Sequence, residues 1–173
     1  MEKGSYGRFG LMILTSAIVM FGLMYLNTYA VSHVHWSETR FYMTLIMAAA
    51  MAVIMLSFML NMYRSTRLNW AIYVGSVMLF AAALALVRSQ ATVSDKSYMK
   101  AMIPHHSIAI LTSERANIQD QRVRELADGI IRTQRKEISE MEWLIADIAK
   151  NGKATTPEEA AARPVPDFSG KKD

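Results

Sequence analysis

Hydrophobic residues dominate the first half of the chain, in three long runs separated by short polar segments. The runs cover residues 9–31, 41–63 and 70–87. Each is close to the ~20 residues that a helix needs to cross a bilayer. The first run is longer than the roughly 7–15 apolar residues of a signal peptide, which favours an uncleaved helix. We therefore predict a membrane anchor over residues 1–88 that contains three transmembrane helices.

The second half of the chain changes to the pattern of amphipathic helices. A polar connector leads into a helix expected over residues 95–117, and a turn leads into a second helix over residues 121–150. The predicted fold class is all-α, with an antiparallel helical hairpin over residues 89–152 after the membrane anchor. Apolar residues of the second helix recur at helical spacing and give it one apolar face. They are Val123, Ala127, Ile130, Ile131, Ile138, Met141, Ile145 and Ile148.

The last segment, residues 153–173, contains three prolines, many charges and no long apolar run. That composition is typical of disordered segments, so we expect a disordered tail. The hairpin before it would expose more apolar surface than two helices bury between themselves. A homodimer that forms a four-helix bundle is the simplest way to cover that surface. Packing on the membrane helices or on another protein are the alternatives.

Charge divides the chain at nearly the same place. Residues 95–173 carry thirteen Lys or Arg and thirteen Asp or Glu, so the net charge of +4 arises in the membrane half. No basic face interleaved with aromatic residues is present, and we expect no nucleic-acid partner. The chain has no cysteine, which excludes disulfides and thiolate metal sites.

The positions of the positive residues predict the orientation in the bilayer. With three spans, the N-terminus and the 64–69 loop share one side, and the 32–40 loop and the hairpin share the other. Positive residues favour the cytoplasmic side. The N-terminus is therefore predicted to be cytoplasmic and the hairpin periplasmic, which implies a multi-pass protein of the bacterial inner membrane. The charges behind this prediction are Lys3, Arg8, Arg64 and Arg67 on the first side, against Arg40 on the second.

Candidate chemistry is concentrated at the start of the first hairpin helix. At about 100° per residue, Asp95, Met99, Met102 and His106 fall on one stripe of that helix. Thioether sulfur and imidazole nitrogen are ligands suited to a soft transition metal, above all Cu(I). The stripe therefore predicts a copper site.

The antiparallel second helix adds residues that face this stripe. Gln134 and Met141 are expected opposite it, with Glu137 at its flank. One interpretation is a Met and His metal site in which Gln134 or Glu137 orients a histidine. The other is a plain bundle core, with the methionines as packing and His106 paired with Gln134.

Two further groups of residues have the chemistry of metal ligands. His33 and His35, in the loop after the first span, are either accessory metal contacts or polar residues of an interfacial loop. Methionines that recur every four residues in the second span form either a track for a soft cation or flexible apolar packing. No charged residue or histidine lies within any span, which favours packing. The series is Met43, Met47, Met51, Met55, Met59 and Met62.

The residues of the stripe resemble a known family. The first helix reads Asp95-x-x-Tyr98-Met99-x-x-Met102-Ile-Pro-His105-His106, and the second contains Gln134-x-x-Glu137-Ile138-x-x-Met141. Over about residues 94–148 this pattern is similar to the DUF305 family, including a subgroup with three membrane spans ahead of one such unit. The resemblance implies a ferritin-like helical bundle and, as in some members, periplasmic copper binding linked to copper tolerance. It also implies the metal ligands, which are Met99, Met102, His105, His106, Met141 and Asp95.

We expect a membrane-anchored, periplasm-facing protein that sequesters Cu(I) or Ag(I), or hands the ion on to a delivery protein. The alternative is a structural or assembly protein whose hairpin docks on a partner membrane complex without binding metal. No Ser, Cys or carboxylate stands at a recognisable catalytic spacing from His105 or His106, so we do not expect an enzyme.

Overall fold

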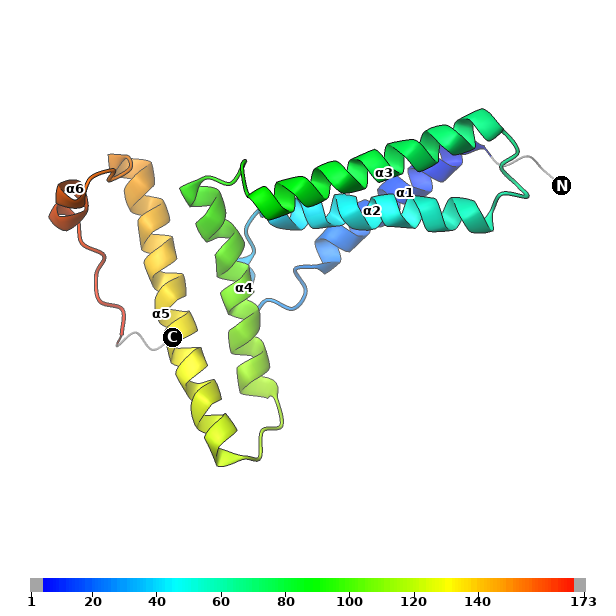
Figure 1. Ribbon diagram of the computed structural model, residues 1–173. Helices are drawn as coiled ribbons and strands as arrows, with labels where there is room; N and C mark the ends of the chain where they lie inside the picture. Colours follow the sequence, from blue (N-terminus) through cyan, green and yellow to red (C-terminus); the bar gives the residue numbers. More distant parts are fainter. Residues whose placement is uncertain (1–4, 170–173) are drawn as a thin grey trace. The chain divides into compact units, whose positions relative to one another are not determined.

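The computed structural model describes residues 5–169, and every regular element among them is helical (Figure 1). The chain forms two compact units. One contains the chain up to residue 26 together with residues 38–93, and the other contains residues 27–37 together with the chain from residue 94. The all-α fold class is confirmed. Lys3, which the orientation argument used, and the end of the predicted tail at residues 170–173 lie outside the described residues.

The first unit consists of α1 (Tyr6–Leu23), α2 (Glu38–Phe58) and α3 (Thr66–Ser89). All three helices are long and apolar enough to cross a membrane, as the sequence predicts. Each begins three or four residues before its predicted span, because a helix can start in polar residues that do not belong to the apolar run. α1 and α2 also end before the predicted limits, and the chain turns after both.

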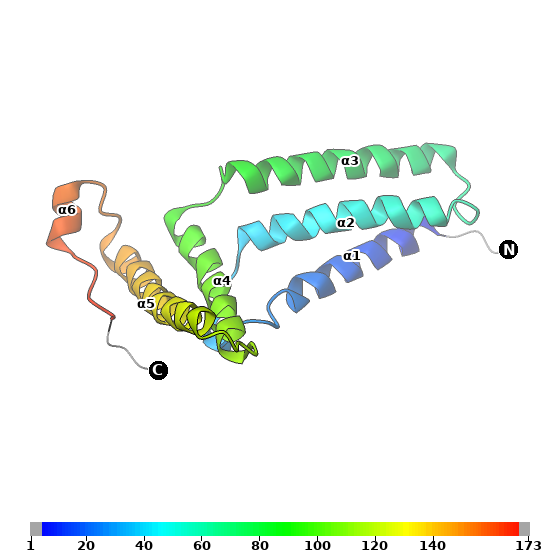
Figure 2. The same cartoon turned by 60° about the horizontal axis from the view of Figure 1, so that its bottom comes forward.

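Within this unit, α2 packs against both α1 and α3 (Figure 2). Ala48, Ala49 and Ala52 are buried along α2. Such small residues let helices approach one another closely. Met55 and Met59, from the methionine series, pack against the buried residues of the unit. Their contacts fit the packing interpretation of that series.

An aromatic and polar cluster joins the start of α1 to the loop between α2 and α3. The rings of Phe9 and Tyr63 lie edge to face with centroids 5.3 Å apart. The hydroxyl of Tyr6 accepts the backbone N–H of Ser65 at 3.0 Å and donates to Oδ1 of Asn69 at 2.8 Å. This end of the three-helix unit is therefore fixed by contacts among α1, the start of α3 and the loop between α2 and α3.

The second unit is built on the hairpin of α4 (Asp95–Arg115) and α5 (Gln121–Asn151), close to the predicted helices. Ser94 and Asp120 cap the two helices, because each side chain accepts a backbone N–H of the first turn. The two helices pack through one apolar core. Its buried residues are Met99, Ile103, Ile110, Ile138 and Met141.

Residues 27–37, which connect α1 and α2 in the sequence, belong to the hairpin's unit. They include the 3-10 helix η1 (Val31–His33). The fully buried hydroxyl of Ser107 on α4 accepts the backbone N–H of Tyr29 at 2.7 Å. It also lies 2.9 Å from Nδ1 of His33. The structure thus divides the chain differently from the predicted boundary at residue 88, because contacts distant in sequence hold this segment.

The C-terminal segment contains α6 (Pro157–Ala162), where the sequence predicts a disordered tail. A capping box forms its start, in which Thr156 accepts the N–H of Glu159 and the Glu159 carboxylate accepts the N–H of Thr156. Nη1 of Arg163 lies 2.7 Å from Oδ2 of Asp147 on α5. Capping and this ion pair give the tail local order that its composition does not reveal.

Candidate functional site

His106 lies on α4 with its side chain only 12% exposed, and both ring nitrogens contact oxygen atoms. Nδ1 donates to the backbone carbonyl of Met102 at 2.9 Å, since a carbonyl oxygen can only accept. Nε2 lies 2.8 Å from Oε2 of Glu137 on α5. Gln134 donates to the same carboxylate oxygen at 3.4 Å. The four residues form one polar network across the two helices.

This network holds the His106 ring in one orientation. Because Nδ1 is held by the Met102 carbonyl, Nε2 is the nitrogen that a metal ion could bind, and the ion would have to displace the hydrogen that Nε2 donates to the Glu137 carboxylate. The Glu137 carboxylate beside Nε2 is 42% exposed, so the pair lies at the edge of the hairpin core and not inside it. An ion that reached Nε2 from solvent would have a negative charge beside it.

Three predicted methionine ligands lie in the adjoining apolar core. Met99 and Met141 are buried in the interface between α4 and α5, and Met102 packs against the same cluster with part of its side chain exposed. Thioether sulfur in such surroundings can serve as adaptable packing or as a ligand for a weakly hydrated cation. The structure therefore brings Met99, Met102 and Met141 together, as the helical stripe predicts.

Two other predicted ligands are not part of this group. His105 is exposed, and its ring centroid lies 6.0 Å from that of His106. Asp95 is exposed at the start of α4, where Nζ of Lys153 lies 2.6 Å from Oδ2. The hydrogen bond from Lys153 is the main cause that lowers the pKa of Asp95. Asp95 is thus already paired with a cation from the chain itself.

Acidic and histidine side chains alone do not form a metal site here. Over residues 5–169, no group of three or more His, Cys, Asp or Glu side chains is arranged to hold a metal ion. The thioether side chains of Met99, Met102 and Met141 are outside the set of groups to which this finding applies.

The accessory histidines occupy a different face of the hairpin. His33 contacts Ser107, which lies about 100° around α4 from His106. Nε2 of His35 is buried, without a hydrogen-bond partner among the described residues. Burial lowers the pKa of His35 below its usual 6.5; Glu142 opposes that shift, whereas Lys100 and His33 reinforce it.

Sequence reasoning missed Ser107 and Lys153. Ser107 is a small polar residue between His106 and Ile108 and carries no spacing signal. Lys153 is one of many charges in the C-terminal segment. Their roles depend on contacts between segments distant in the sequence.

Comparison with known proteins adds a family and one relative. The family model described as "Domain of unknown function (DUF305)" matches residues 75–164. The chain is also 32% identical over 141 residues to "Uncharacterized protein L153" of Acanthamoeba polyphaga mimivirus, an alignment that covers 78% of this chain and 91% of the relative. No solved structure matches the chain. The matched region includes α6, beyond the residues on which the predicted resemblance rests.

Proposed function

We propose that this chain, which belongs to the DUF305 family, is a membrane-anchored protein that binds a soft monovalent cation, Cu(I) or Ag(I), at His106 and the neighbouring methionines. One observation carries the proposal. The His106 ring bonds through Nδ1 to the backbone of Met102, and Met102 shares the hairpin core with Met99 and Met141.

Each residue has a distinct role in the proposed site. His106 supplies an imidazole nitrogen, and Met99, Met102 and Met141 supply soft sulfur ligands. Glu137 balances the positive charge of the ion, and Gln134 holds the Glu137 carboxylate in place. His105, which is exposed nearby, is an outer contact, and Asp95 is left to its ion pair with Lys153. No bond is made or broken in this function.

The proposed setting is a bacterial inner membrane, with α1, α2 and α3 as the anchor. The cationic residues Arg8, Arg64 and Arg67 favour a cytoplasmic N-terminus, and three spans then carry the hairpin to the periplasm. There the protein would sequester the ion or pass it to a delivery protein, in copper tolerance or homeostasis.

The test is an anaerobic Cu(I) titration of the full chain in detergent micelles against a competing chromogenic chelator. His106→Ala should weaken binding by about 100-fold or more, beyond the range expected for residues that only support a ligand. Met99→Leu with Met141→Leu removes two sulfurs while it keeps core volume, and it should weaken binding as well. Met78→Leu, on the exposed surface of α3, is the matched control.

His105→Ala should reduce affinity less than His106→Ala. The proposal fails if the affinity of both the His106→Ala variant and the double methionine variant equals that of the control. A titration with Ag(I) in place of Cu(I) should give the same order of variants.

A second copy of the chain is the proposed partner of the hairpin. Val123, Leu126 and Ile130 are exposed on α5, with Leu126 64% exposed. Glu137 follows Ile130 by seven residues, so it lies within about 20° of the same side of the helix. A copy that covers this apolar stripe would also cover the pair of His106 and Glu137.

The oligomeric state of the full chain in micelles tests whether a second copy is the partner. Leu126→Glu should convert a dimer to a monomer in sedimentation, whereas Val165→Glu, on an exposed residue of the C-terminal segment, should not. The exposed stripe also favours the second candidate function, a hairpin that docks on a different membrane complex without metal. That alternative is supported if Leu126→Glu abolishes capture of a membrane partner while neither Cu(I) nor Ag(I) binds.

A further inference from the structure

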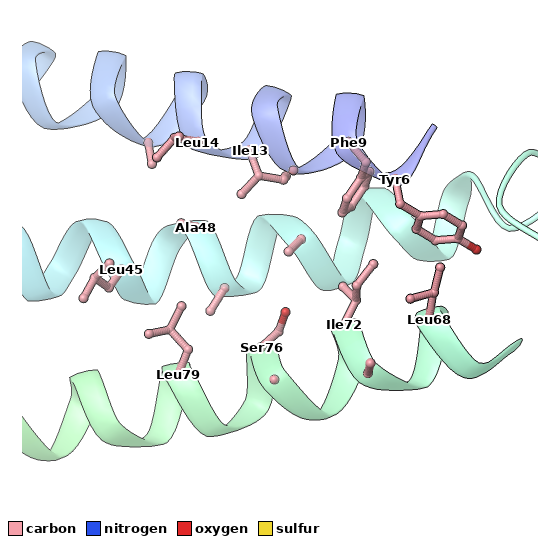
Figure 3. A pocket seen from close by; sticks show the side chains of 16 residues that line it. Tyr6, Phe9, Ile13, Leu14, Leu45, Ala48, Leu68, Ile72, Ser76 and Leu79 are labelled. Carbon is pink, nitrogen blue, oxygen red and sulfur yellow. The ribbon is translucent and has the colours of Figure 1, made fainter. Parts of the chain in front are cut away.

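The three-helix unit contains an apolar groove between α1 and α3, with α2 as its floor (Figure 3). α2 packs against both neighbours, whereas among the described residues the backbones of α1 and α3 do not approach each other and their side chains meet at Tyr6 and Asn69. The groove has a volume of about 550 Å³, and side chains from all three helices line it. Its lining is apolar except near Tyr6 and Ser76.

Small residues create this space. Most of the floor is formed by Ala48, Ala49 and Ala52, which are buried, and Leu45 adds one longer side chain from α2. Gly10 on α1 and Gly75 on α3 line the walls, and a Cβ added at either would meet no atom within 4 Å. Beside these two glycines, the groove therefore contains space that larger side chains would fill.

The dimensions of the groove fit a hydrocarbon chain. Its lining extends along α1 from Tyr6 to Ala17 and along α3 from Leu68 to Leu79. At 1.5 Å per residue, each stretch is about 16 Å long. Half the hydrocarbon core of a bilayer is about 15 Å thick. The groove thus has the length of one leaflet.

A second transmembrane helix is too large for the same space. A helix is 10–12 Å wide, so a volume of this size would hold only about four of its residues. A lipid tail is narrow and flexible, and it enters sideways from the bilayer without a change in the helices.

Positive charge gathers at the end of the groove that contains Tyr6. Arg8, Arg64 and Arg67 are exposed at the start of α1 and in the segment that leads into α3. The first turns of α1 and α3 contain no acidic residue. The two starts are held together by the hydrogen bonds of Tyr6 with Ser65 and Asn69. A phosphate at this end would meet only cationic and neutral groups of these segments.

We propose that the groove binds one acyl chain of an anionic phospholipid, whose phosphate lies beside Arg8, Arg64 and Arg67. The bound lipid fills the wedge between α1 and α3 and completes the packing of the unit. This site is independent of the proposed metal site, which lies in the other unit.

Native mass spectrometry of the full chain, released from micelles that contain phosphatidylglycerol and phosphatidylcholine, tests the proposal. The wild-type chain should retain one phosphatidylglycerol in preference to phosphatidylcholine. Gly10→Leu with Gly75→Leu fills the groove and should reduce retention at least about tenfold, because the leucine side chains occupy the space of the acyl chain and packing is what holds an apolar group within hydrocarbon surroundings. Gly22→Leu is the matched control, because Gly22 also faces open space on α1 but does not line the groove.

The headgroup is tested by Arg64→Gln with Arg67→Gln, which should lower the preference for phosphatidylglycerol by roughly fivefold for each arginine removed. Equal retention in the groove-filling variant and the Gly22→Leu control would overturn the acyl-chain site. An unchanged preference in the arginine variant would overturn the headgroup assignment. A groove-filling variant that changes from dimer to monomer with no change in lipid would identify a second copy as the occupant and reject the lipid.

Discussion

On α4, His106 and Ser107 are neighbours in sequence, yet they lie about 100° apart on the helix. His106 contacts the partly exposed carboxylate of Glu137, whereas Ser107 accepts a backbone N–H from the segment that covers it. On the histidine flank, defined by Met102, His106 and Glu137, a polar pair remains partly open to solvent. On the serine flank, defined by Ser107, Tyr29 and His33, the chain's own segment 27–37 covers the buried hydroxyl. A polar group at a helix interface can therefore either support the structure or remain open to an ion from solution.

A buried hydroxyl that receives its partner from the same chain contributes to structure, because an unpaired polar group in that place would destabilise the fold. A histidine whose partner is a partly exposed carboxylate can exchange that contact for an ion from solution. The comparison predicts that substitutions on the two flanks have separable effects: metal affinity on the histidine flank and stability on the serine flank.

The largest effect is expected on the histidine flank. Glu137→Gln keeps the shape of the side chain but removes the charge beside Nε2 of His106, so Cu(I) affinity should fall roughly 10–100-fold. Competition with a chromogenic chelator measures the change. Glu142→Gln, which alters the carboxylate near His35 instead, should leave the affinity unchanged. Equal losses in the two variants would contradict the separation of the flanks.

A smaller effect is expected from Ser107→Ala. The backbone N–H of Tyr29 and the ring of His33 would both lose their partner, so the free energy of unfolding should fall by about 1–3 kcal/mol. Denaturation of the full chain in micelles, followed by tryptophan fluorescence, measures this change. Thr112→Ala is the control, because that hydroxyl bonds only within its own helix. Metal affinity that fell together with stability would show that the flanks are coupled.

The smallest effect is a pH dependence confined to the serine flank. Burial lowers the pKa of His35, so the proton binds more readily when segment 27–37 is released than when it is docked. Docking is therefore fully stable above the usual value of 6.5 and weakens as the pH falls below 6.5 towards the lowered pKa.

Hydrogen exchange at the Tyr29 amide, corrected for its intrinsic pH dependence, should show lost protection on the acidic side of 6.5. The amide of Ile138 in the hairpin core provides the reference within the same sample. His35→Gln should abolish the pH effect at Tyr29. If the His35→Gln variant kept the same pH dependence, a titratable group other than His35 would be its cause.

Much of the fold could be predicted because its signals are local. Apolar runs predicted α1, α2 and α3, and helical spacing predicted α4 and α5 with the turn between them. The same spacing placed Met99, Met102 and Met141 in one cluster. Segment 27–37 was not predictable in this way, since its partner Ser107 lies 78 residues further along the chain from Tyr29.

Two site details depended on information that a helical stripe does not contain. Glu137, predicted at the flank, is the direct partner of His106, whereas Gln134 contacts that carboxylate instead. Asp95 lies on the predicted stripe, but Lys153 from the C-terminal segment pairs with it. Helix α6 did have a readable signal, because Thr156 and Glu159 stand at the spacing of a capping box. Its prolines and charges led to the prediction of disorder.

The docked segment 27–37 also sets an order for biosynthesis. The segment lies between α1 and α2, so it leaves the ribosome before the helix that receives it. The donor at Tyr29 precedes its acceptor at Ser107 by 78 residues, a delay of roughly 4–16 s at 5–20 residues per second. During that interval the segment has no α4 to bind. Helices α2 and α3 are synthesised between the segment and α4, so both are made before the second unit can assemble. Assembly of the second unit therefore waits for the first to be synthesised, and a fragment that starts after α3 would lack a piece of its own fold.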